Sequence, residues 1–427
     1  MPASPSTARA INDRLALRLL QQEGPLTAGQ LKQLTGLSRP TVADLVERLT
    51  ASGLITVAGE SGEQRRGPNA RLYGLVADRA HLAALDVRTE GVVVLVSDLV
   101  GRVLAEASVP IGGDTGTGPA VEQAVAAVER TAKEAGADRL HTVGIGAPGL
   151  IDPATGDLRD SGGLPAWHRR LAAALQERLP EARVTVENET NLAALAEQRE
   201  GAAQDRDTFV LLWLGHGVGA AVVLDGALRR GASGGTGEIG FLPVPGTTSL
   251  PSATDCDGGF HSLAGAAAIG ALAHEFGLPA TEPTDGPGAA TTVAEAVSAL
   301  PEEMAGADEC DAGERPPSAG PGTREYVGSN SAASCAARFL GALADRIAVG
   351  VASVVAVLDP GCVVLGGEIG QAGGAVLARL VEERLRRMSP LVTEVRAGSL
   401  GGAAVLRGAL LTARERAQDE LFAPPER

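Results

Sequence analysis

The stretch from Leu211 to Gly240 reads LLWLGHGVGAAVVLDGALRRGASGGTGEIG and contains nine glycines. An apolar run over 209–214 enters a turn at Gly215-His216-Gly217, and a second run over 218–224 ends at Asp225-Gly226. Apolar runs separated by glycine pairs and an Asp-Gly step predict consecutive strands joined by tight turns. Closely spaced glycines also let a backbone approach a ligand, because their N–H groups can bind phosphate or hydroxyl oxygens.

Glu238 is a lone carboxylate in the glycine-rich segment GTGEIG. Two interpretations are open at this point. Glu238 is either a ligand-binding group on a glycine loop or a solvated acid in a plain strand meander, since glycine-rich motifs match loosely.

Length and cysteine content narrow the class of protein. A chain of 427 residues predicts roughly three domains of ~150 residues. No apolar run approaches the ~18–20 residues of a membrane span, and the first ten residues lack a secretory signal pattern. The four cysteines form no CxxC pair, so we expect neither a disulfide framework nor a zinc ribbon. These features favour a cytoplasmic protein.

Charge is unevenly distributed along the chain. Residues 1–80 hold 10 Lys/Arg and 7 Asp/Glu, a net charge of +3, and the other residues hold 27 against 45, a net charge of −18. Because an acidic body repels phosphate backbones, any contact with nucleic acid is expected from the N-terminal part.

Residues 11–50 show helical patterning. Ile11, Leu15 and Leu19 recur at four-residue intervals and predict one buried face. Thr27-Ala28-Gly29-Gln30 is a capping box, and the helix that follows it is expected to turn Leu31 and Leu34 inward. Thr35-Gly36-Leu37 turns the chain, and Ser38 caps a further helix with an apolar stripe made of Val42, Leu45, Val46 and Leu49.

Two short helices joined by a glycine-containing turn predict a helix-turn-helix, and two strands over 54–57 and 70–75 make it a winged one. The second helix is expected to enter the major groove. The candidate DNA contacts are Thr27, Ser38, Arg39, Pro40 and Thr41, together with Arg65 and Arg66 in the wing. The alternative is a three-helix packing unit with a hairpin, which binds nothing.

Residues 80–190 predict alternating strands and helices. Strands are expected over 82–86, 91–97, 102–107, 142–147 and 183–186, and helices over 121–135 and 168–179. The last strand leads into Glu187-Asn188-Glu189-Thr190-Asn191, where a helix begins. Open α/β sheets bind ligands at the carboxyl ends of strands. The alternative is that Asn188 and Thr190 only cap the helix.

The remaining segments are predicted more coarsely. Residues 260–300 and 331–357 should be helical, 362–365 should be a strand that ends at Gly366-Gly367, and a final helix should cover 403–417. Residues 301–322 are rich in Pro, Gly, Glu, Asp and Ala and predict a disordered insertion.

Five segments in a fixed order resemble the ROK family (repressors, open reading frames and sugar kinases). The segments are LSRPTVADLVERLTASGLI, VGIGAPGLIDPATG, ENETNLAALAE, LGHGVGAAVVLDGALRRGASGGTGEIG and DPGCVVLGGEIG. The resemblance covers about residues 11–415 and implies an α/β protein. That fold has an N-terminal winged helix-turn-helix and a two-lobed actin/hexokinase-like (ribonuclease H-like) body with ligand in the cleft.

The resemblance also implies roles for single residues. Asn188 and Glu238 match sugar-binding positions, Glu189 stands at the catalytic aspartate of the kinases, and His261 falls at a sugar-binding glutamate. His261 can equally be a surface histidine beside a degraded loop. The nucleotide-loop positions are Gly215, Gly217, Gly366 and Gly367.

Departures from the family pattern argue against kinase activity. The kinases' D-x-G-G-T is here Asp86-Val87-Arg88-Thr89-Glu90, so side chains replace two glycines and Glu90 adds negative charge where phosphate would bind. The zinc-site histidine is replaced by Phe241, and of the cysteine cluster only Cys256 is kept. One thiol cannot form a tetrahedral site, so no zinc or other metal, and no cofactor, is expected.

Three functions remain to be weighed. We expect a DNA-binding regulator, more specifically a repressor, whose non-enzymatic body binds a sugar or sugar-derived effector and forms a homodimer or larger oligomer on an operator. The alternatives are an ATP-dependent sugar kinase with a DNA-binding head, with Glu189 as its base, and a regulator that has lost its ligand. The expected domains are 1–78, 79–190 completed by 403–417, and 191–402.

Overall fold

A computed structural model of the chain describes residues 5–60, 70–159, 164–247, 249–252, 257–279, 285–301 and 330–423. These residues divide into two compact units. Unit 1 comprises residues 1–147, 165–187 and 409–427, and unit 2 comprises residues 148–164 and 188–408. Arg65, Arg66, Cys256 and the insertion expected over 301–322 (save residue 301) lie outside the described residues.

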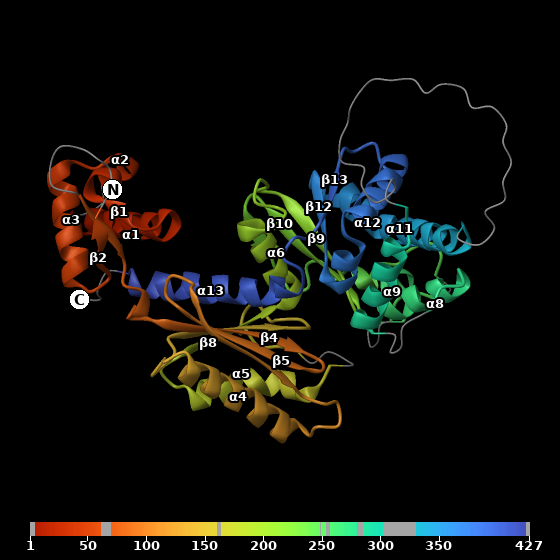
Figure 1. The fold of residues 1–427 in the computed structure, drawn as a ribbon, viewed down its shortest axis with the longest axis horizontal. Helices are drawn as coiled ribbons and strands as arrows, with labels where there is room; N and C mark the ends of the chain where they lie inside the picture. The colour runs from red at the N-terminus through yellow and green to blue at the C-terminus, as the bar shows by residue number, and fades with distance from the viewer. Residues whose placement is uncertain are drawn as a thin grey trace. The chain divides into compact units, whose positions relative to one another are not determined.

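The N-terminal part of unit 1 is the winged helix-turn-helix expected from the sequence (Figure 1). It contains α1 (Pro5–Glu23), β1 (Leu26–Thr27), α2 (Ala28–Thr35), α3 (Arg39–Ala51), β2 (Ile55–Glu60) and β3 (Arg71–Leu75). The three strands form an antiparallel sheet in the order β1-β3-β2. The stripe Val42, Leu45, Val46 and Leu49 is buried as predicted.

In this winged helix-turn-helix, called the head below, two predictions of which helix residues are buried are wrong. Ile11 and Leu15 are 58% and 40% exposed, and α1 instead buries Ala16, Leu17 and Leu20. Leu34 is 49% exposed, whereas Leu31 is buried. Both helices carry apolar residues on more than one face, so helical periodicity alone could not select the face that the neighbouring helices and strands cover.

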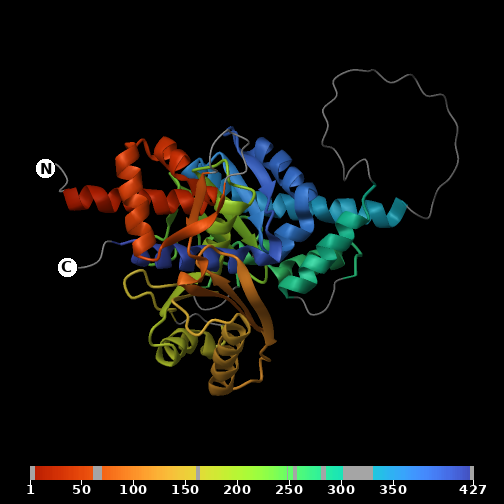
Figure 2. The same ribbon diagram turned by 60° about the vertical axis from the view of Figure 1, so that its left-hand side comes forward.

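The rest of unit 1 is a five-stranded sheet in the order β6-β5-β4-β7-β8. Its strands are β4 (His81–Arg88), β5 (Gly91–Asp98), β6 (Val103–Pro110), β7 (Thr142–Ala147) and β8 (Arg183–Asn188). Helices α4 (Thr117–Glu134) and α5 (Ala166–Arg178) lie together on one face in both views (Figures 1 and 2). On the other face α13 (Ala404–Leu421) packs so closely that a Cβ on Gly144 would lie 2.6 Å from the Ala409 carbonyl oxygen.

The head is bonded to the sheet part of unit 1 through α1 and α13. Gln418 donates from Nε2 to Gln21 Oε1 over 2.9 Å, and Gln21 Nε2 donates to the Val100 carbonyl over 3.2 Å. Arg14 forms an ion pair with Asp419. The winged head is therefore held by the C-terminal helix as well as by the chain that follows β3.

Unit 2 is built on a second five-stranded sheet in the order β11-β10-β9-β12-β13. Its strands are β9 (Phe209–Leu214), β10 (Val218–Leu224), β11 (Ala227–Arg229), β12 (Cys362–Gly366) and β13 (Glu394–Ala397). The meander expected from the quoted glycine-rich stretch is present, since β9, β10 and β11 pair antiparallel in sequence order. Strands β9, β12 and β13 pair in parallel.

Helices cover both faces of this sheet. Val210, Leu212 and Leu214 of β9 face a large core formed with α8 (Ala266–Glu275), α9 (Gly286–Ser298), α11 (Asn330–Leu358) and α12 (Gly367–Met388). The alternate residues Leu211 and Trp213 face α6 (Glu189–Glu200). Neither α12 nor β13 was expected from the sequence, although Leu377, Val381 and Leu385 form a buried stripe at helical spacing in α12.

Helix α11 is long and apolar enough to cross a membrane by length and composition, since an 18-residue window within residues 332–358 has a mean hydropathy of 1.8. Its residues Phe339, Leu343 and Ile347 are instead completely buried in the core of unit 2. The expectation that no run approaches membrane length holds only for uninterrupted runs, because Arg338, Asp345 and Arg346 interrupt this one. A core helix with these contacts does not require a membrane.

Candidate functional site

Helix α3 begins with a capped and exposed turn. Ser38 is its N-cap, and its hydroxyl accepts from the Thr41 N–H over 3.4 Å and lies 2.7 Å from the Thr41 hydroxyl. Pro40 occupies the first turn, where a missing N–H costs nothing. Because the hydroxyls of Ser38 and Thr41 are hydrogen-bonded to each other, their first role is to cap the helix.

Arg39 is the long cationic group of this turn. Ser38, Arg39 and Pro40 are exposed, and within the described residues no ion pair involves Arg39. Farther along the helix, the acidic Asp44 and Glu47 are exposed. Only the first turn of α3 therefore combines a free guanidinium with the N–H groups of a helix N-terminus, which suits it to bind phosphate or a base edge.

Thr27 is placed one helix earlier as half of the expected capping box. Its Oγ1 accepts from the Gln30 N–H over 3.2 Å, and its own N–H donates to Gln30 Oε1 over 2.9 Å. Gly36 then ends α2 in the left-handed conformation with φ +69°, which glycine adopts without strain. The turn between α2 and α3 is consequently fixed at both ends.

In unit 2, three consecutive residues of β10 gather the segments that carry the sugar-site candidates. The Val218 N–H donates to His261 Nδ1 over 3.1 Å. A Cβ on Gly219 would lie 3.7 Å from Thr190 Oγ1, next to Asn188 and Glu189. The Ala220 N–H donates to the Gly237 carbonyl over 2.7 Å, next to Glu238. Segments as far apart in sequence as Thr190 and His261 thus meet along one strand.

Asn188 is the N-cap of α6. Its Oδ1 accepts from the N–H groups of Thr190 and Asn191 over 2.9 and 3.2 Å. Its Nδ2 donates to the Gly149 carbonyl over 3.0 Å and to Glu189 Oε2 over 2.8 Å. Capping is therefore a real role of Asn188, as the alternative held. The bond between the Asn188 amide and the Glu189 carboxylate directs the two groups at each other. A ligand that binds both groups would replace this bond.

Glu238 lies on a loop whose backbone only glycine permits. Gly237 has φ +91°, and a Cβ there would lie 1.9 Å from the Ala220 carbonyl oxygen. Gly234 has φ +83°, and a Cβ there would lie 2.0 Å from the Ile151 carbonyl oxygen. These close contacts fix the loop against β10 and residue 151. Desolvation by the surrounding protein raises the pKa of the Glu238 carboxyl, although the residue retains exposed surface.

His261 begins α7 (His261–Ala264) and is half-buried. Burial, and to a lesser extent the neighbouring His216, lowers its pKa, so the imidazole is neutral at pH 7. Since Nδ1 accepts from Val218, the proton is on Nε2, which is then a hydrogen-bond donor. The ring lies edge-on to Phe241 at a centroid distance of 5.3 Å, and a Cβ on Gly240 would overlap it.

The four nucleotide-loop positions lie at the carboxyl ends of β9 and β12, two interior strands of the sheet of unit 2. Gly215 and Gly217 form the β9–β10 turn, in which the Gly215 N–H donates to the Gly217 carbonyl over 3.0 Å. Gly366 ends β12, where it pairs with Trp213, and Gly367 starts α12 with φ +76°. Glu368 follows them and was not among the site residues expected from the sequence; its Oε2 lies 2.7 Å from where a Gly215 Cβ would be.

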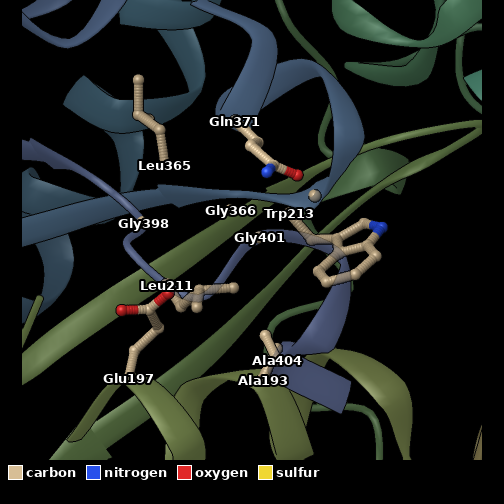
Figure 3. A pocket seen from close by; sticks show the side chains of 11 residues that line it. Ala193, Glu197, Leu211, Trp213, Leu365, Gly366, Gln371, Gly398, Gly401 and Ala404 are labelled. Atoms are coloured by element: carbon tan, nitrogen blue, oxygen red, sulfur yellow. The ribbon is translucent and has the colours of Figure 1, made fainter. Parts of the chain in front are cut away.

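The space beside this glycine pair is small. A cavity of about 10 Å³ lies between β9, the Gly366-Gly367 turn and residues 398–401, and is lined by Glu197, Trp213 and Gln371 among others (Figure 3). Glu197 closes it by accepting from the N–H groups of Ala202 and Leu400 over 2.7 and 3.0 Å. This volume holds about one water molecule, so it is not a sugar or nucleotide site as it stands.

In unit 1, the segment that replaces D-x-G-G-T has an internal ion pair. Asp86 is 3% exposed, and its Oδ2 accepts from Arg88 Nε and Nη2 over 2.8 and 2.6 Å. Desolvation raises the pKa of Asp86 and Arg88 opposes that rise. His168 lies 3.2 Å from the Arg88 carbonyl through Nε2, and burial lowers its pKa to about 4. The sequence showed the substitution but not these bonds.

Both the N-terminal head and the body that follows it match known protein families. The ROK family profile matches residues 82–278 and 324–416, and the MarR family profile matches residues 11–67. A xylose repressor of Caldicellulosiruptor bescii is 26% identical over 245 residues, which cover 55% of this chain and 59% of that protein. The DNA-binding transcriptional dual regulator NagC of Escherichia coli is 27% identical over 246 residues, which cover 55% and 58%. The match spans less than two thirds of these relatives.

Solved structures extend the likeness to the whole chain. A ROK family transcriptional regulator described as a homolog of the E. coli MLC protein superposes with a TM-score of 0.71 at 20% identity and covers 97% of this chain and 98% of its own. A ROK hexokinase from Thermus thermophilus superposes with a TM-score of 0.58 at 27% identity and covers 79% and 99%. The fold is thus a winged helix-turn-helix followed by an actin/hexokinase-type body, and the chain belongs to the ROK family.

Proposed function

We propose that the chain is a DNA-binding transcriptional repressor whose kinase-like body binds a sugar or sugar-derived effector. The observation that carries the proposal is the first turn of α3, where Arg39 is exposed at a capped helix N-terminus in a winged head. Such a turn enters the major groove in helix-turn-helix proteins. Ser38, Pro40, Thr41 and Thr27 flank it, and the wing arginines Arg65 and Arg66 would contact the backbone or minor groove.

The sugar site is proposed around β10. Asn188, Glu238 and His261 offer an amide, a carboxylate and an imidazole N–H, which together can donate to and accept from sugar hydroxyls. Glu189 is within hydrogen-bond distance of Asn188 and would join them. The relatives are named for xylose and N-acetylglucosamine, so D-xylose and N-acetyl-D-glucosamine are the first effectors to test.

The same proposal holds that the body is not a sugar kinase. Similarity to a ROK hexokinase keeps kinase activity as the alternative, with Glu189 as base and ATP at Gly215, Gly217, Gly366 and Gly367. One contact speaks against it. Arg88 uses Nε and Nη2 to bind Asp86, so the chain's own guanidinium neutralises the carboxylate in the segment that stands where the kinases have D-x-G-G-T.

We further propose that the protein acts in the cytoplasm as a homodimer or larger homo-oligomer. A two-fold dimer would place its recognition helices about 34 Å apart on one face of the DNA. The head spans residues 1–78 in this proposal, and the body is formed by 79–190 with 403–417 and by 191–402.

The test is recovery of bound genomic fragments with purified full-length protein, followed by fluorescence anisotropy on the enriched fragment with and without each sugar. Specific binding that one sugar weakens at least tenfold supports the proposal. Phosphorylation of a hexose, pentose or amino sugar in a coupled assay, lost in Glu189→Gln, with no duplex bound, would establish the kinase instead. DNA binding without thermal stabilisation by any sugar identifies a regulator that has lost its ligand.

A further inference from the structure

The turn between β9 and β10 lies against the first turns of two helices. A Cβ on Gly286, the first residue of α9, would lie 3.0 Å from the His216 nitrogen and 3.5 Å from the Gly215 carbonyl carbon. Gly367, the first residue of α12, is closer still to β9, since its Cβ would lie 2.3 Å from the Leu214 carbonyl oxygen. Glycines at all three places bring the backbone of the turn against the starts of both helices.

Backbone N–H groups at helix N-termini and in glycine turns attract anions. The N-terminus of α9 has its own cap, because Asp285 Oδ1 accepts from the Gly288 N–H over 2.8 Å. The N-cap of α12 is Gly366, which has no side chain to cap the helix. A carboxylate or phosphate is therefore favoured at the start of α12.

Glu368 supplies that carboxylate. It is in the first turn of α12, and its Oε2 is fully buried. The same atom lies 2.7 Å from a Cβ placed on Gly215 and 3.5 Å from one placed on Gly286, so the carboxylate lies over both glycines. One oxygen of Glu368 takes the space that a side chain would fill at Gly215, and the same oxygen would be in van der Waals contact with a Cβ on Gly286.

We propose that the Glu368 carboxylate permanently fills the phosphate-binding position of this glycine-lined turn. The turn then holds a side chain of the chain itself in place of a nucleotide phosphate, and a second anion is excluded by charge and by volume. This inference deepens the proposed function, since it rests on a body that senses a sugar without using ATP, and it adds a residue of unit 2 to the features of unit 1 that oppose nucleotide binding.

Anion rescue in the full-length protein tests the proposal. Thermal unfolding is followed for wild type, Glu368→Ala and the control Glu383→Ala, which removes a partly exposed carboxylate from the same helix. Each protein is titrated with inorganic phosphate against potassium chloride of equal ionic strength. We expect phosphate to raise the Tm of Glu368→Ala saturably, by roughly 2–4 °C more than that of the other two proteins.

Equal phosphate responses in the three proteins would overturn the assignment. If Glu368→Ala does not fold, Glu368→Ser also removes the carboxylate and frees its volume, and the same comparison applies to it. DNA binding is measured in parallel on the enriched fragment. Loss of DNA binding in all three proteins bears on the proposed function, whereas the difference in phosphate response bears on Glu368 alone.

A double-mutant cycle tests the contact itself. Gly215→Ala should destabilise the wild type more than it destabilises Glu368→Ala, because the new methyl group meets Glu368 Oε2 only when Glu368 is present. Equal destabilisation in the two backgrounds would contradict the position given to the carboxylate.

Discussion

Arg39 and Arg88 each stand at the end of a secondary-structure element, but their guanidinium groups have different surroundings. Arg39 opens α3 in the head, is exposed, and forms no ion pair within the described part of the chain. Arg88 ends β4 in the sheet of unit 1 and binds the buried Asp86 through two nitrogens. A cation therefore contributes to recognition of an external anion only where the chain has not already neutralised it.

The two regions also differ in how much of the fold depends on them. The turn around Arg39 is held by local caps between residues at most three apart. The end of β4 is held by the Asp86–Arg88 pair and by His168, which comes from a helix 80 residues away. Changes near Arg88 should therefore affect stability, and changes near Arg39 should affect binding.

The largest effect is expected from acid acting on His168. In the unfolded chain this histidine binds a proton below pH 6.5, whereas in the folded protein burial lowers its pKa to about 4. The unfolded state thus binds more protons than the folded state between these pH values. The contribution of His168 to the unfolding free energy is therefore complete above pH 6.5 and is lost as the pH falls toward 4. The loss is about 3 kcal/mol, and urea unfolding of His168→Gln should show a shallower pH slope than wild type. Parallel slopes would contradict the buried neutral histidine.

Arg39→Ala should weaken binding to the enriched DNA fragment by about 1–3 kcal/mol if Arg39 reads a base edge. Anisotropy titrations at fixed salt measure this, and urea unfolding should be unchanged because the side chain is exposed. The matched control is Arg130→Ala, an exposed arginine on α4 in the sheet part of unit 1. Wild-type affinity in Arg39→Ala would remove the residue from the interface.

Arg88→Ala should destabilise the protein by about 1–2 kcal/mol at neutral pH, less than for a fully buried pair because Arg88 is 42% exposed. Desolvation already raises the pKa of Asp86, and removal of Arg88 raises it further. The protonated carboxyl needs no cation, so the difference from wild type in urea unfolding should shrink as the pH is lowered.

Arg102→Ala is the control for that measurement. Asp98 is as buried as Asp86, but its Oδ1 accepts from the N–H groups of Val100 and Arg102 over 3.1 and 2.9 Å. Because these backbone bonds survive the substitution, Arg102→Ala should cost less than Arg88→Ala. An equal cost would show that backbone donors do not replace the guanidinium.

Ser38→Ala should have the smallest effect, a loss of about 1 kcal/mol in the unfolding free energy of the head through the lost N-cap. DNA affinity should fall with it only as far as the first turn of α3 loosens. Ser298→Ala is the control, because that hydroxyl donates to the Ala294 carbonyl within α9 and caps nothing.

Much of the local structure could be predicted from residue patterns. The capping box at Thr27, the cap at Ser38, the meander around Gly215 and the strand over 142–147 each depend on residues close in sequence, where backbone propensity and hydrogen bonding decide. Helical periodicity wrongly predicted Ile11, Leu15 and Leu34 to be buried. When a helix has apolar residues on two faces, its sequence does not show which face a neighbouring element covers.

By itself the sequence determined the winged head, the glycine-rich meander and the positions at which Asn188, Glu238 and His261 stand. Tertiary structure alone decided that three consecutive residues of β10 gather those segments, that Arg88 binds Asp86, and that Glu368 lies over Gly215. The physical reason is that caps and turns arise within a few residues of chain, whereas a buried charge finds its partner only after distant elements have packed.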